Sequence, residues 1–401
     1  MKRFKSEGGS LIELVLRRLD WFRVGMTPRK LLNQVRSIGQ FLTKSETASA
    51  FPVIVKVDIS PACNLRCPSC VHAAPGDDPV LQEQELSGRQ RMDVTRFAEL
   101  MEQLRGKSSL VSLYYLGDPL AHPQVEELCG IARDAGLGVH LSTNFSFRLS
   151  DERIRRLVSC GVTELTIAFD GMTQETYELT RVGARVEWVV DNLERLCAAK
   201  RELGLSLPTI EVQYIKFQHN LGDLEKAEAF CERIGVDRFS TFWGTYSNYV
   251  DHGPDRVEVV GPRPAARTPL CSWPHFNTLI KFNGDVIPCC WYRAGDQYAP
   301  SRDMRVVGNV FETPLEEIWN SPAYETMRAM VNDPERASRQ LDESEDSFCH
   351  GCPKLYVTKR DVSWLAASEL SWDEVFTMGP KGDPIRRPET IPVQIEKAST
   401  G

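Results

Sequence analysis

From about residue 53 onward, the hydrophobic and polar positions alternate between two patterns. Short apolar runs, typical of buried strands, occupy residues 53–59, 110–116, 139–142, 164–169, 209–216 and 238–242. Segments with helical spacing lie between them, at 94–105, 123–135, 151–159, 186–203 and 222–234. Strands that alternate with helices predict βαβ units and a parallel sheet. Six such units predict an α/β fold with an open, partial (β/α)6 TIM-like barrel over residues 53–245, whose chemistry lies at the carboxyl ends of the strands.

The pattern changes after the predicted barrel. Residues 246–270 are rich in Pro, Gly and Asp and are interpreted as a linker. Residues 271–360 form a predicted small second domain, in which Asn283-Gly284 lies between two extended runs and predicts a hairpin over 276–288. Short helices are expected at 314–320 and 322–331. Residues 361–401 are expected to form a C-terminal helix and then a disordered tail.

The first 52 residues predict a basic, helical N-terminal extension. Ten basic and four acidic residues fall within positions 1–50, although the whole chain has a net charge of −7. Apolar residues recur there at roughly helical spacing, among them Leu11, Leu14, Val15 and Leu19. Two interpretations are open. The helix packs on the outside of the catalytic domain, or it attaches weakly to an anionic membrane or a partner surface.

Composition narrows the class of protein. A chain of 401 residues, 42% hydrophobic and 26% charged, can bury a large core, and its acidic balance argues against nucleic acid as a partner. Neither a bilayer-spanning run nor a secretory signal is evident, so a cytoplasmic location is expected. Twelve cysteines are many for such a protein, because disulfides rarely persist there. Ligation of a metal or an iron–sulfur cluster is the leading explanation.

Three of the cysteines, Cys63, Cys67 and Cys70, follow the first predicted strand in the order Cys-x3-Cys-x2-Cys. Three thiolates on one loop can hold three irons of a cubane cluster and leave the fourth iron open to a chelating ligand. A structural zinc site requires four ligands, and ferredoxin-like sites supply four cysteines to each cluster. The spacing therefore resembles the hallmark of the radical S-adenosylmethionine (SAM) superfamily. One departure is Ser69, where the family usually has an aromatic residue.

The resemblance extends to the ends of the later predicted strands and covers about residues 53–245. Gly117-Asp118-Pro119 is similar to the family's Gly-Gly-Glu-Pro element, with Leu116 in place of the first glycine and a shorter carboxylate. Ser142-Thr143-Asn144 looks like the stretch that contacts polar groups of SAM, and Arg181 looks like the arginine that faces the SAM carboxylate. The resemblance implies SAM-binding roles for Gly117, Asp118, Ser142, Asn144, Asp170 and Arg181. Asp170 also has an alternative interpretation as a helix cap.

A second set of cysteines lies in the predicted second domain. The hairpin followed by Cys349-His350-Gly351-Cys352 resembles the auxiliary-cluster extension of SPASM and Twitch radical SAM enzymes. Since no cysteine follows Cys352, the resemblance implies the shorter Twitch form with one auxiliary [4Fe–4S] cluster. Its expected ligands are Cys271, Cys289, Cys349 and Cys352. Cys290 faces the opposite side of a strand from Cys289 and is not expected to join them. A four-cysteine zinc site is the alternative.

The resemblance implies that an external one-electron donor, flavodoxin- or ferredoxin-like, reduces the first [4Fe–4S] cluster, which cleaves SAM to a deoxyadenosyl radical that abstracts a substrate hydrogen atom. Oxidation of a small sugar- or cyclitol-like molecule, with the auxiliary cluster as electron acceptor, is the favoured outcome. Redox-neutral epimerisation is an alternative, with Cys290 or Cys160 as hydrogen donor. Peptide maturation and a non-enzymatic role as an electron carrier or scaffold are the others.

Overall fold

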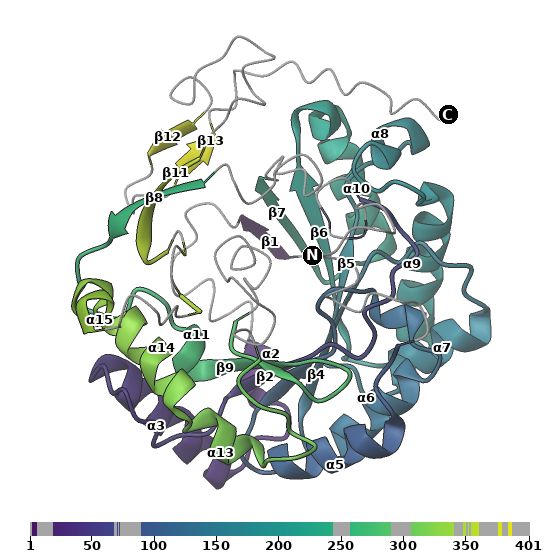
Figure 1. Cartoon of the computed structure of the whole chain (residues 1–401). Helices are drawn as coiled ribbons and strands as arrows, with labels where there is room; N and C mark the ends of the chain where they lie inside the picture. The colour runs from purple at the N-terminus through teal and green to yellow at the C-terminus, as the bar shows by residue number, and fades with distance from the viewer. Residues whose placement is uncertain are drawn as a thin grey trace.

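The computed structural model describes residues 2–5, 19–67, 70, 72, 90–243, 257–289, 306–340, 348–349, 352, 354–360, 376–378 and 384–386. The main feature is a nine-stranded sheet in the order β1-β7-β6-β5-β4-β3-β2-β9-β10. Its six central strands are parallel and curve into an open barrel (Figure 1). They are β2 (Ile54–Val57), β3 (Leu110–Ser112), β4 (Gly138–Thr143), β5 (Glu164–Ala168), β6 (Thr209–Lys216) and β7 (Arg238–Trp243). The predicted partial barrel is confirmed.

Helices cover the outer face of this sheet, as Figure 1 shows. They are α5 (Val94–Leu104), α6 (Val125–Asp134), α7 (Asp151–Ser159), α8 (Gln174–Glu178), α9 (Val186–Glu202) and α10 (Leu224–Ile234), with short 3-10 helices η2 (Pro119–Ala121) and η3 (Gln218–Asp223). Local sequence starts several of them: the Asp93 carboxylate caps α5, and the Ser150 hydroxyl caps α7. Alternate strand residues such as Val55 and Val57 are fully buried in the core that these helices share.

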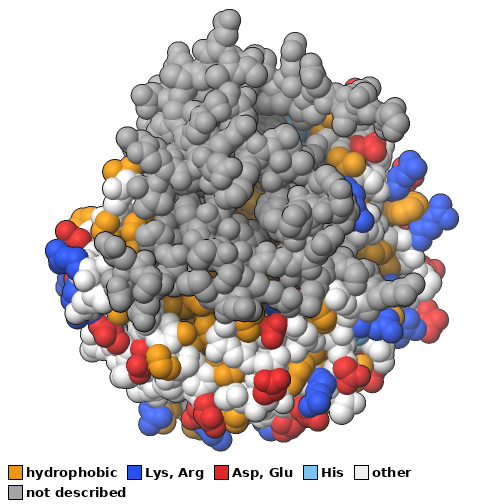
Figure 2. All heavy atoms as spheres, viewed as in Figure 1, with side chains coloured by type: hydrophobic (Ala, Val, Ile, Leu, Met, Phe, Trp, Pro, Cys, Tyr) orange, Lys and Arg blue, Asp and Glu red, His pale blue; other side chains and the backbone are white. Residues whose placement is uncertain are grey.

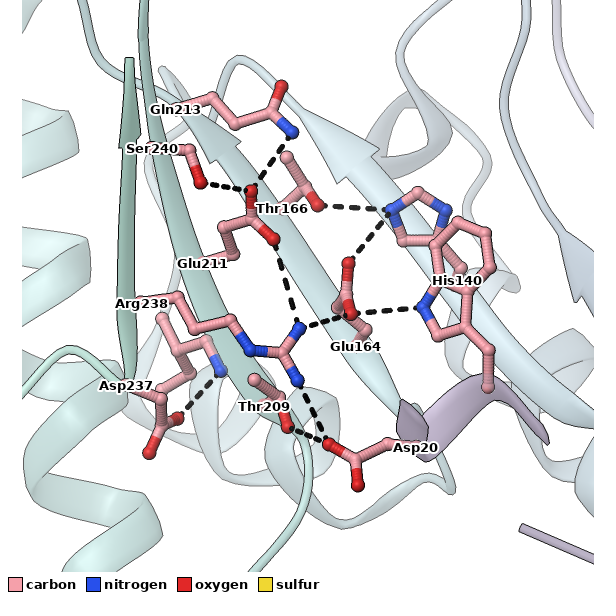
Figure 3. A network of polar contacts seen from close by, with 12 residues as sticks. Asp20, His140, Glu164, Thr166, Thr209, Glu211, Gln213, Asp237, Arg238 and Ser240 are labelled. Atoms are coloured by element: carbon pink, nitrogen blue, oxygen red, sulfur yellow. Dashed lines mark hydrogen bonds and ion pairs between the residues drawn. The ribbon is translucent and has the colours of Figure 1, made fainter. Parts of the chain in front are cut away.

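The inward-facing strand positions near the amino-terminal end of the barrel carry a buried polar network (Figure 3). The Arg238 guanidinium donates to Glu164 at 2.7 Å and to Asp20 at 3.0 Å, and it lies 3.9 Å from Glu211. Glu164 and Glu211 are fully buried, so the guanidinium is needed to offset their desolvation. Asp20 belongs to α2 (Leu19–Arg23), which closes this end of the barrel. The residues of this network lie at the opposite end of the strands from the first cysteine loop.

The predicted hairpin is confirmed, but its placement differs from the expectation. Strands β9 (Asn277–Ile280) and β10 (Val286–Ile287) are antiparallel, with a left-handed Gly284 in the turn. Strand β9 also pairs in parallel with β2, so the hairpin extends the barrel sheet beside the first strand. Helices α11 (Trp273–Phe276), α13 (Leu315–Trp319), α14 (Pro322–Asn332) and α15 (Pro334–Gln340) complete this region.

Three segments differ from the sequence-based expectation. Within the predicted linker, β8 (Val257–Pro262) forms a strand that pairs with β11 (Tyr356–Arg360), because the linker returns along the second domain. The described part of the C-terminal region contains β12 (Phe376–Met378) paired with β13 (Pro384–Arg386), where a helix and a disordered tail were expected. At the N-terminus, β1 (Lys2–Lys5) adds a parallel strand beside β7. Leu11, Leu14 and Val15 lie outside the described residues.

The helical part of the N-terminal extension consists of α2 and α3 (Pro28–Leu42). The Thr27 side chain caps α3, and Pro28 occupies its first position, where a missing N–H costs nothing. Side chains of α3 donate to backbone carbonyls of the barrel, as Asn33 does to Phe51 at 2.9 Å. The N-terminal helix therefore packs on the outside of the barrel. None of the helices described combines the length and apolar character needed to span a lipid bilayer.

Candidate active site

The first three cysteines occupy the loop that follows β2. Backbone N–H of Cys70 donates to the carbonyl of Cys67 at 2.9 Å, which closes a turn between them. Cys63 and Cys67 pack against the edge of the barrel core, and all three side chains are half-buried. Burial, the charge of Asp118 and the neighbouring Cys67 and Cys70 thiols together raise the pKa of Cys63 to about 12. The three thiols therefore belong to one loop, beside the edge of the barrel core.

Gly117 fixes the path of this loop. A β-carbon at position 117 would overlap the carbonyl oxygens of Ser60 and Ala62 and would lie 2.5 Å from the carbonyl carbon of Pro61. The next residue completes the contact, because the Asp118 N–H donates to the Ala62 carbonyl at 2.8 Å. Gly117 therefore allows the end of β3 to lie directly against the backbone that leads into Cys63.

Asp118 holds the ends of β3 and β4 together. Its buried carboxylate accepts hydrogen bonds from the Leu120 N–H at 3.0 Å, the Thr143 hydroxyl at 2.9 Å and the Asn144 N–H at 2.7 Å. Desolvation raises the pKa of Asp118 to about 6, although these hydrogen bonds act in the opposite direction. The side chain is thus engaged within the protein, which favours a positioning role. The sequence resemblance did not indicate Thr143 as its partner.

Replacement of Asp118 by asparagine would test this positioning role. The substitution keeps the shape but places an amide NH2 opposite donors, so we expect the free energy of unfolding to fall by about 1–3 kcal/mol. Chemical denaturation of the cluster-free protein measures it. Glu152→Gln is the matched control, because its ion pair with Arg156 is exposed and the change should stay within about 0.5 kcal/mol. Equal stabilities of the two variants would contradict the proposed role.

Asn144 connects the end of β4 to the cysteine loop. Its side-chain amide donates to Asn64 at 2.9 Å and approaches the Cys63 sulfur at 3.8 Å, while its oxygen accepts from the Ser146 N–H at 2.8 Å. Ser142 is half-buried and faces Thr166 of β5 in the strand register. The sequence-predicted residues after β3 and β4 therefore meet the first cysteine loop. A role for Ser142 and Asn144 in SAM binding remains a prediction.

Arg181 and Asp170 form a buried ion pair beside Cys67. The Arg181 Nε donates to Asp170 at 2.6 Å, and the exposed fractions of the two side chains are 16% and 1%. The other Asp170 oxygen accepts from the Ile215 N–H at 2.8 Å, so the carboxylate is fixed at the end of β6. Burial raises the pKa of Cys67, whereas the charge and hydrogen bond of Arg181 oppose that shift. Arg181 is thus oriented by Asp170 next to a predicted cluster ligand.

Exchange of Arg181 for lysine, or of Asp170 for asparagine, is expected to weaken SAM binding about 10–100-fold, by analogy with loss of a residue that orients a metal ligand. Lysine keeps the charge but loses the planar, multiply donating group. The double variant should lose little more than either single one, because the two residues act as one unit. Calorimetric titration of each reconstituted variant with SAM measures the affinity for SAM. Additive losses would contradict this coupling.

The predicted auxiliary ligands share one region of the fold, although they are far apart in the chain. Cys271, Cys289 and Cys352 pack against a second, smaller core that contains the buried Cys349. Burial and the neighbouring thiols of Cys352 and Cys271 raise the pKa of Cys349 well above its usual value. The backbone N–H of Trp273 donates to the Cys271 sulfur at 3.4 Å, the type of contact that influences cluster potentials.

Thiols are the donors that iron–sulfur clusters use, and the sequence supplies three cysteines in the loop after β2 and four expected ligands in the second domain. Among the residues that the structure describes, no group of three or more His, Cys, Asp or Glu side chains converges on a single metal-ion position. Cys290 and Ser69 lie outside the described residues. Cys160 ends α7, before β5 begins, and donates to the Leu157 carbonyl at 3.3 Å. That position is at the amino-terminal side of the barrel, away from Cys63, and does not favour a hydrogen-donor role.

The fold and the cysteine loop define an iron–sulfur enzyme built on a partial barrel, and comparisons identify the family. The model of the radical SAM superfamily matches residues 57–210, and that of the SPASM iron–sulfur cluster-binding domain matches residues 271–353. The chain carries a radical SAM domain followed by a SPASM domain. These domains imply three kinds of cofactor, namely a [4Fe–4S] cluster, auxiliary iron–sulfur clusters and SAM. The SPASM match, which spans the second cysteine set, favours an iron–sulfur cluster over the zinc alternative.

The relatives include proteins that modify peptides or cofactors. The chain is 23% identical over 309 residues to the tungsten-containing aldehyde ferredoxin oxidoreductase cofactor-modifying protein of Pyrococcus furiosus, covering 68% of this chain and 82% of that one. It is 27% identical to mycofactocin maturase MftC of Mycobacterium ulcerans, covering 55% of this chain and about half (54%) of the relative. It is 24% identical to PqqA peptide cyclase of Streptomyces rochei, covering 69% of this chain and 77% of the relative.

A solved structure confirms the fold. SuiB of Streptococcus suis superposes with a TM-score of 0.54 at 13% identity, over 79% of this chain and 77% of that one. At this identity the likeness concerns the fold alone.

Proposed function

We propose that this radical SAM enzyme abstracts a hydrogen atom from a peptide substrate and acts as a maturase. The similarity to PqqA peptide cyclase, which spans 77% of that protein, is the observation that carries this proposal. The mycofactocin maturase supports it. When bound, the first cluster and SAM supply the one-electron cleavage that yields a carbon radical. Peptide maturation thus replaces oxidation of a sugar or cyclitol as the first candidate.

The described residues prepare the site for that chemistry. Cys63, Cys67 and Cys70 provide three thiols, which lose their protons and become thiolates when they bind iron. We propose that Arg181, held by Asp170, faces the SAM carboxylate, since a guanidinium binds a carboxylate through parallel hydrogen bonds. Four cysteines that include Cys349 bind one auxiliary cluster. An external electron donor is a feature of the family, and a flavodoxin- or ferredoxin-like protein would fit that role.

Oxidation of a small polar molecule, such as a sugar or cyclitol, is the second candidate. The polar strand residues Thr166, Gln213 and Ser240 do not support it, because they bond within the network in Figure 3, away from the first cysteine loop. Epimerisation would need a hydrogen donor near the radical. Cys160 is remote from the first cysteine loop, which leaves Cys290 as the candidate, and a fully active Cys290→Ser variant would exclude it.

One experiment separates the two substrate classes. The anaerobically reconstituted enzyme is incubated with SAM, a reductant and cell extract that has been separated into a peptide fraction and a small-molecule fraction. We expect the peptide fraction to increase deoxyadenosine formation and to contain a product of altered mass. The Cys67→Ala variant provides the blank for both fractions. An increase confined to the small-molecule fraction would overturn the peptide proposal in favour of the second candidate.

A further inference from the structure

Helix α3 has its polarity reversed relative to an ordinary surface helix. The side chains that it turns toward the barrel are polar, and Lys30, Ser37 and Gln40 are at most 4% exposed. Two of these groups bind segments that lead into the amino-terminal ends of strands: Lys30 donates to the Gly136 carbonyl before β4, and Gln40 donates at 3.1 Å to the His275 carbonyl of α11, before β9. Hydrogen bonds therefore hold the helix in place, together with Phe41, whose ring packs on Phe276, and its aliphatic residues are left outside.

The outer face of α3 is a continuous aliphatic surface. In the part of the chain that the structure describes, it holds half of the strongly exposed large hydrophobic residues: Leu31 (53%), Leu32 (49%), Val35 (58%), Ile38 (50%) and Leu42 (60%). Their spacing places them on one broad side of the helix. A β-carbon at Gly39, on the same side, would meet nothing within 4 Å. Isolated exposed leucines are ordinary, but a grouped set marks a docking surface.

The exposed charged residues of α3 itself are all positive. Helix α3 contains no Asp or Glu, and Arg29 and Arg36 are exposed beside the aliphatic residues. Within the described residues neither arginine forms an ion pair, and the same holds for Arg23 just before the helix. Elsewhere on the described surface, Lys or Arg and Asp or Glu side chains are interspersed around the rim of the molecule (Figure 2). The exposed side of α3 thus combines apolar residues with unneutralised cations.

We propose that α3 docks the protein on an anionic lipid surface. An amphipathic helix of this kind lies in the plane of a bilayer interface, with its aliphatic residues among the acyl chains and its arginines against the phosphates. A second copy of the chain fits less well. Its α3 would bring more arginines and no carboxylate, and one face of a 15-residue helix offers much less than the roughly 800 Å² per partner of a stable interface.

The position of α3 makes such docking compatible with catalysis. The helix contacts the loops before β2, β3, β4 and β9, for example through Asn33 to the Lys107 carbonyl at 3.2 Å and Gln34 to the Ser109 hydroxyl at 2.8 Å. The first cysteine loop lies after the opposite, carboxyl ends of the strands. In Figure 1, α3 lies at the periphery of the barrel. A membrane-docked enzyme would therefore keep its active-site end open to substrate and electron donor.

Vesicle sedimentation tests the proposal with the full-length, reconstituted protein. We expect binding to vesicles of phosphatidylcholine with phosphatidylglycerol and little binding to phosphatidylcholine alone. The double variant Val35→Glu/Ile38→Glu should bind roughly tenfold more weakly or worse, because it removes two of the inserted side chains. Arg29→Glu/Arg36→Glu should abolish the preference for anionic vesicles. Leu203→Glu, a substitution at a 44% exposed leucine that follows α9, is the matched control and should bind as the unaltered protein does.

The outcomes are distinguishable from one another and from failure of the proposed function. All three variants should retain deoxyadenosine formation, since α3 lies outside the active site. The proposal would be overturned if the unaltered protein did not bind vesicles, or if Val35→Glu/Ile38→Glu bound them as tightly as the unaltered protein does. A dimer detected by light scattering and dissociated by that variant would replace the lipid surface with a second copy of the chain.

Discussion

Replacement of Cys67 by alanine is expected to abolish SAM cleavage, a fall of at least about 10⁶-fold toward the uncatalysed rate. With Cys63 and Cys70 alone, only two thiolates remain to hold the first cluster, and Arg181 loses the sulfur beside which it lies. The iron content should fall by about four atoms per chain, the content of one cubane cluster. Deoxyadenosine assays and iron analysis after anaerobic reconstitution measure both effects.

Two further cysteine variants serve as controls for this result. Cys352→Ala removes a predicted ligand of the auxiliary cluster, so it should also lose iron but retain SAM cleavage. Cys197→Ala alters a buried cysteine of α9 and should keep both iron and activity, at a modest cost in stability. The assignment of the first cluster is wrong if Cys67→Ala still forms deoxyadenosine at a rate similar to that of Cys197→Ala.

The amino-acid pattern was sufficient to predict the barrel and the approach of residues that follow separate strands. Each βαβ unit has a strong local signal, and the strand β6 matches its predicted bounds. Because parallel strands end at the same edge of a sheet, residues that follow separate strands were expected to meet. The contact of Asn144 with Asn64 and the position of Arg181 beside Cys67 agree with that expectation.

Other features depend on contacts that no local pattern reveals. The pairing of β9 with β2 joins segments more than 200 residues apart, and a hairpin signal at Asn283-Gly284 says nothing about which strand it will meet. The engagement of Asp118 by Thr143 is likewise tertiary. A signal was available for the barrel network: Glu164, Glu211 and Arg238 are charged residues within apolar strands, which predicts mutual neutralisation inside the fold.

Helix α3 shows how an amphipathic pattern can mislead. Its leucines and Ile38 have helical spacing, which ordinarily indicates the face that packs on the core. In the structure the polar face packs instead, because the barrel offers backbone carbonyls such as that of Gly136, which need donors. Periodicity alone identifies two faces of a helix, and the chemistry of the surface that receives it decides which one is buried.

Replacement of Gly117 by alanine is expected to prevent correct assembly of the first cluster. The new β-carbon would overlap the backbone of Ser60 and Ala62, and backbone atoms cannot move aside as the end of a side chain can. Overpacking costs typically 1–3 kcal/mol, and we expect the upper part of that range here. The loop before Cys63 must shift to relieve the overlap, which breaks the hydrogen bond from Asp118 to Ala62 and moves the first thiolate away from the other two.

Gly222→Ala is the matched control, because a β-carbon at Gly222 would meet nothing within 4 Å. Under anaerobic reconstitution Gly222→Ala should bind iron and cleave SAM as the unaltered protein does, whereas Gly117→Ala should lose the first cluster and keep the auxiliary one. A loss of stability alone would lower the iron occupancy of both clusters together. Selective loss of the first cluster would therefore indicate displacement of Cys63 and not general unfolding. Full SAM cleavage by Gly117→Ala would show that the loop tolerates the shift and that close contact with the end of β3 does not position the ligand.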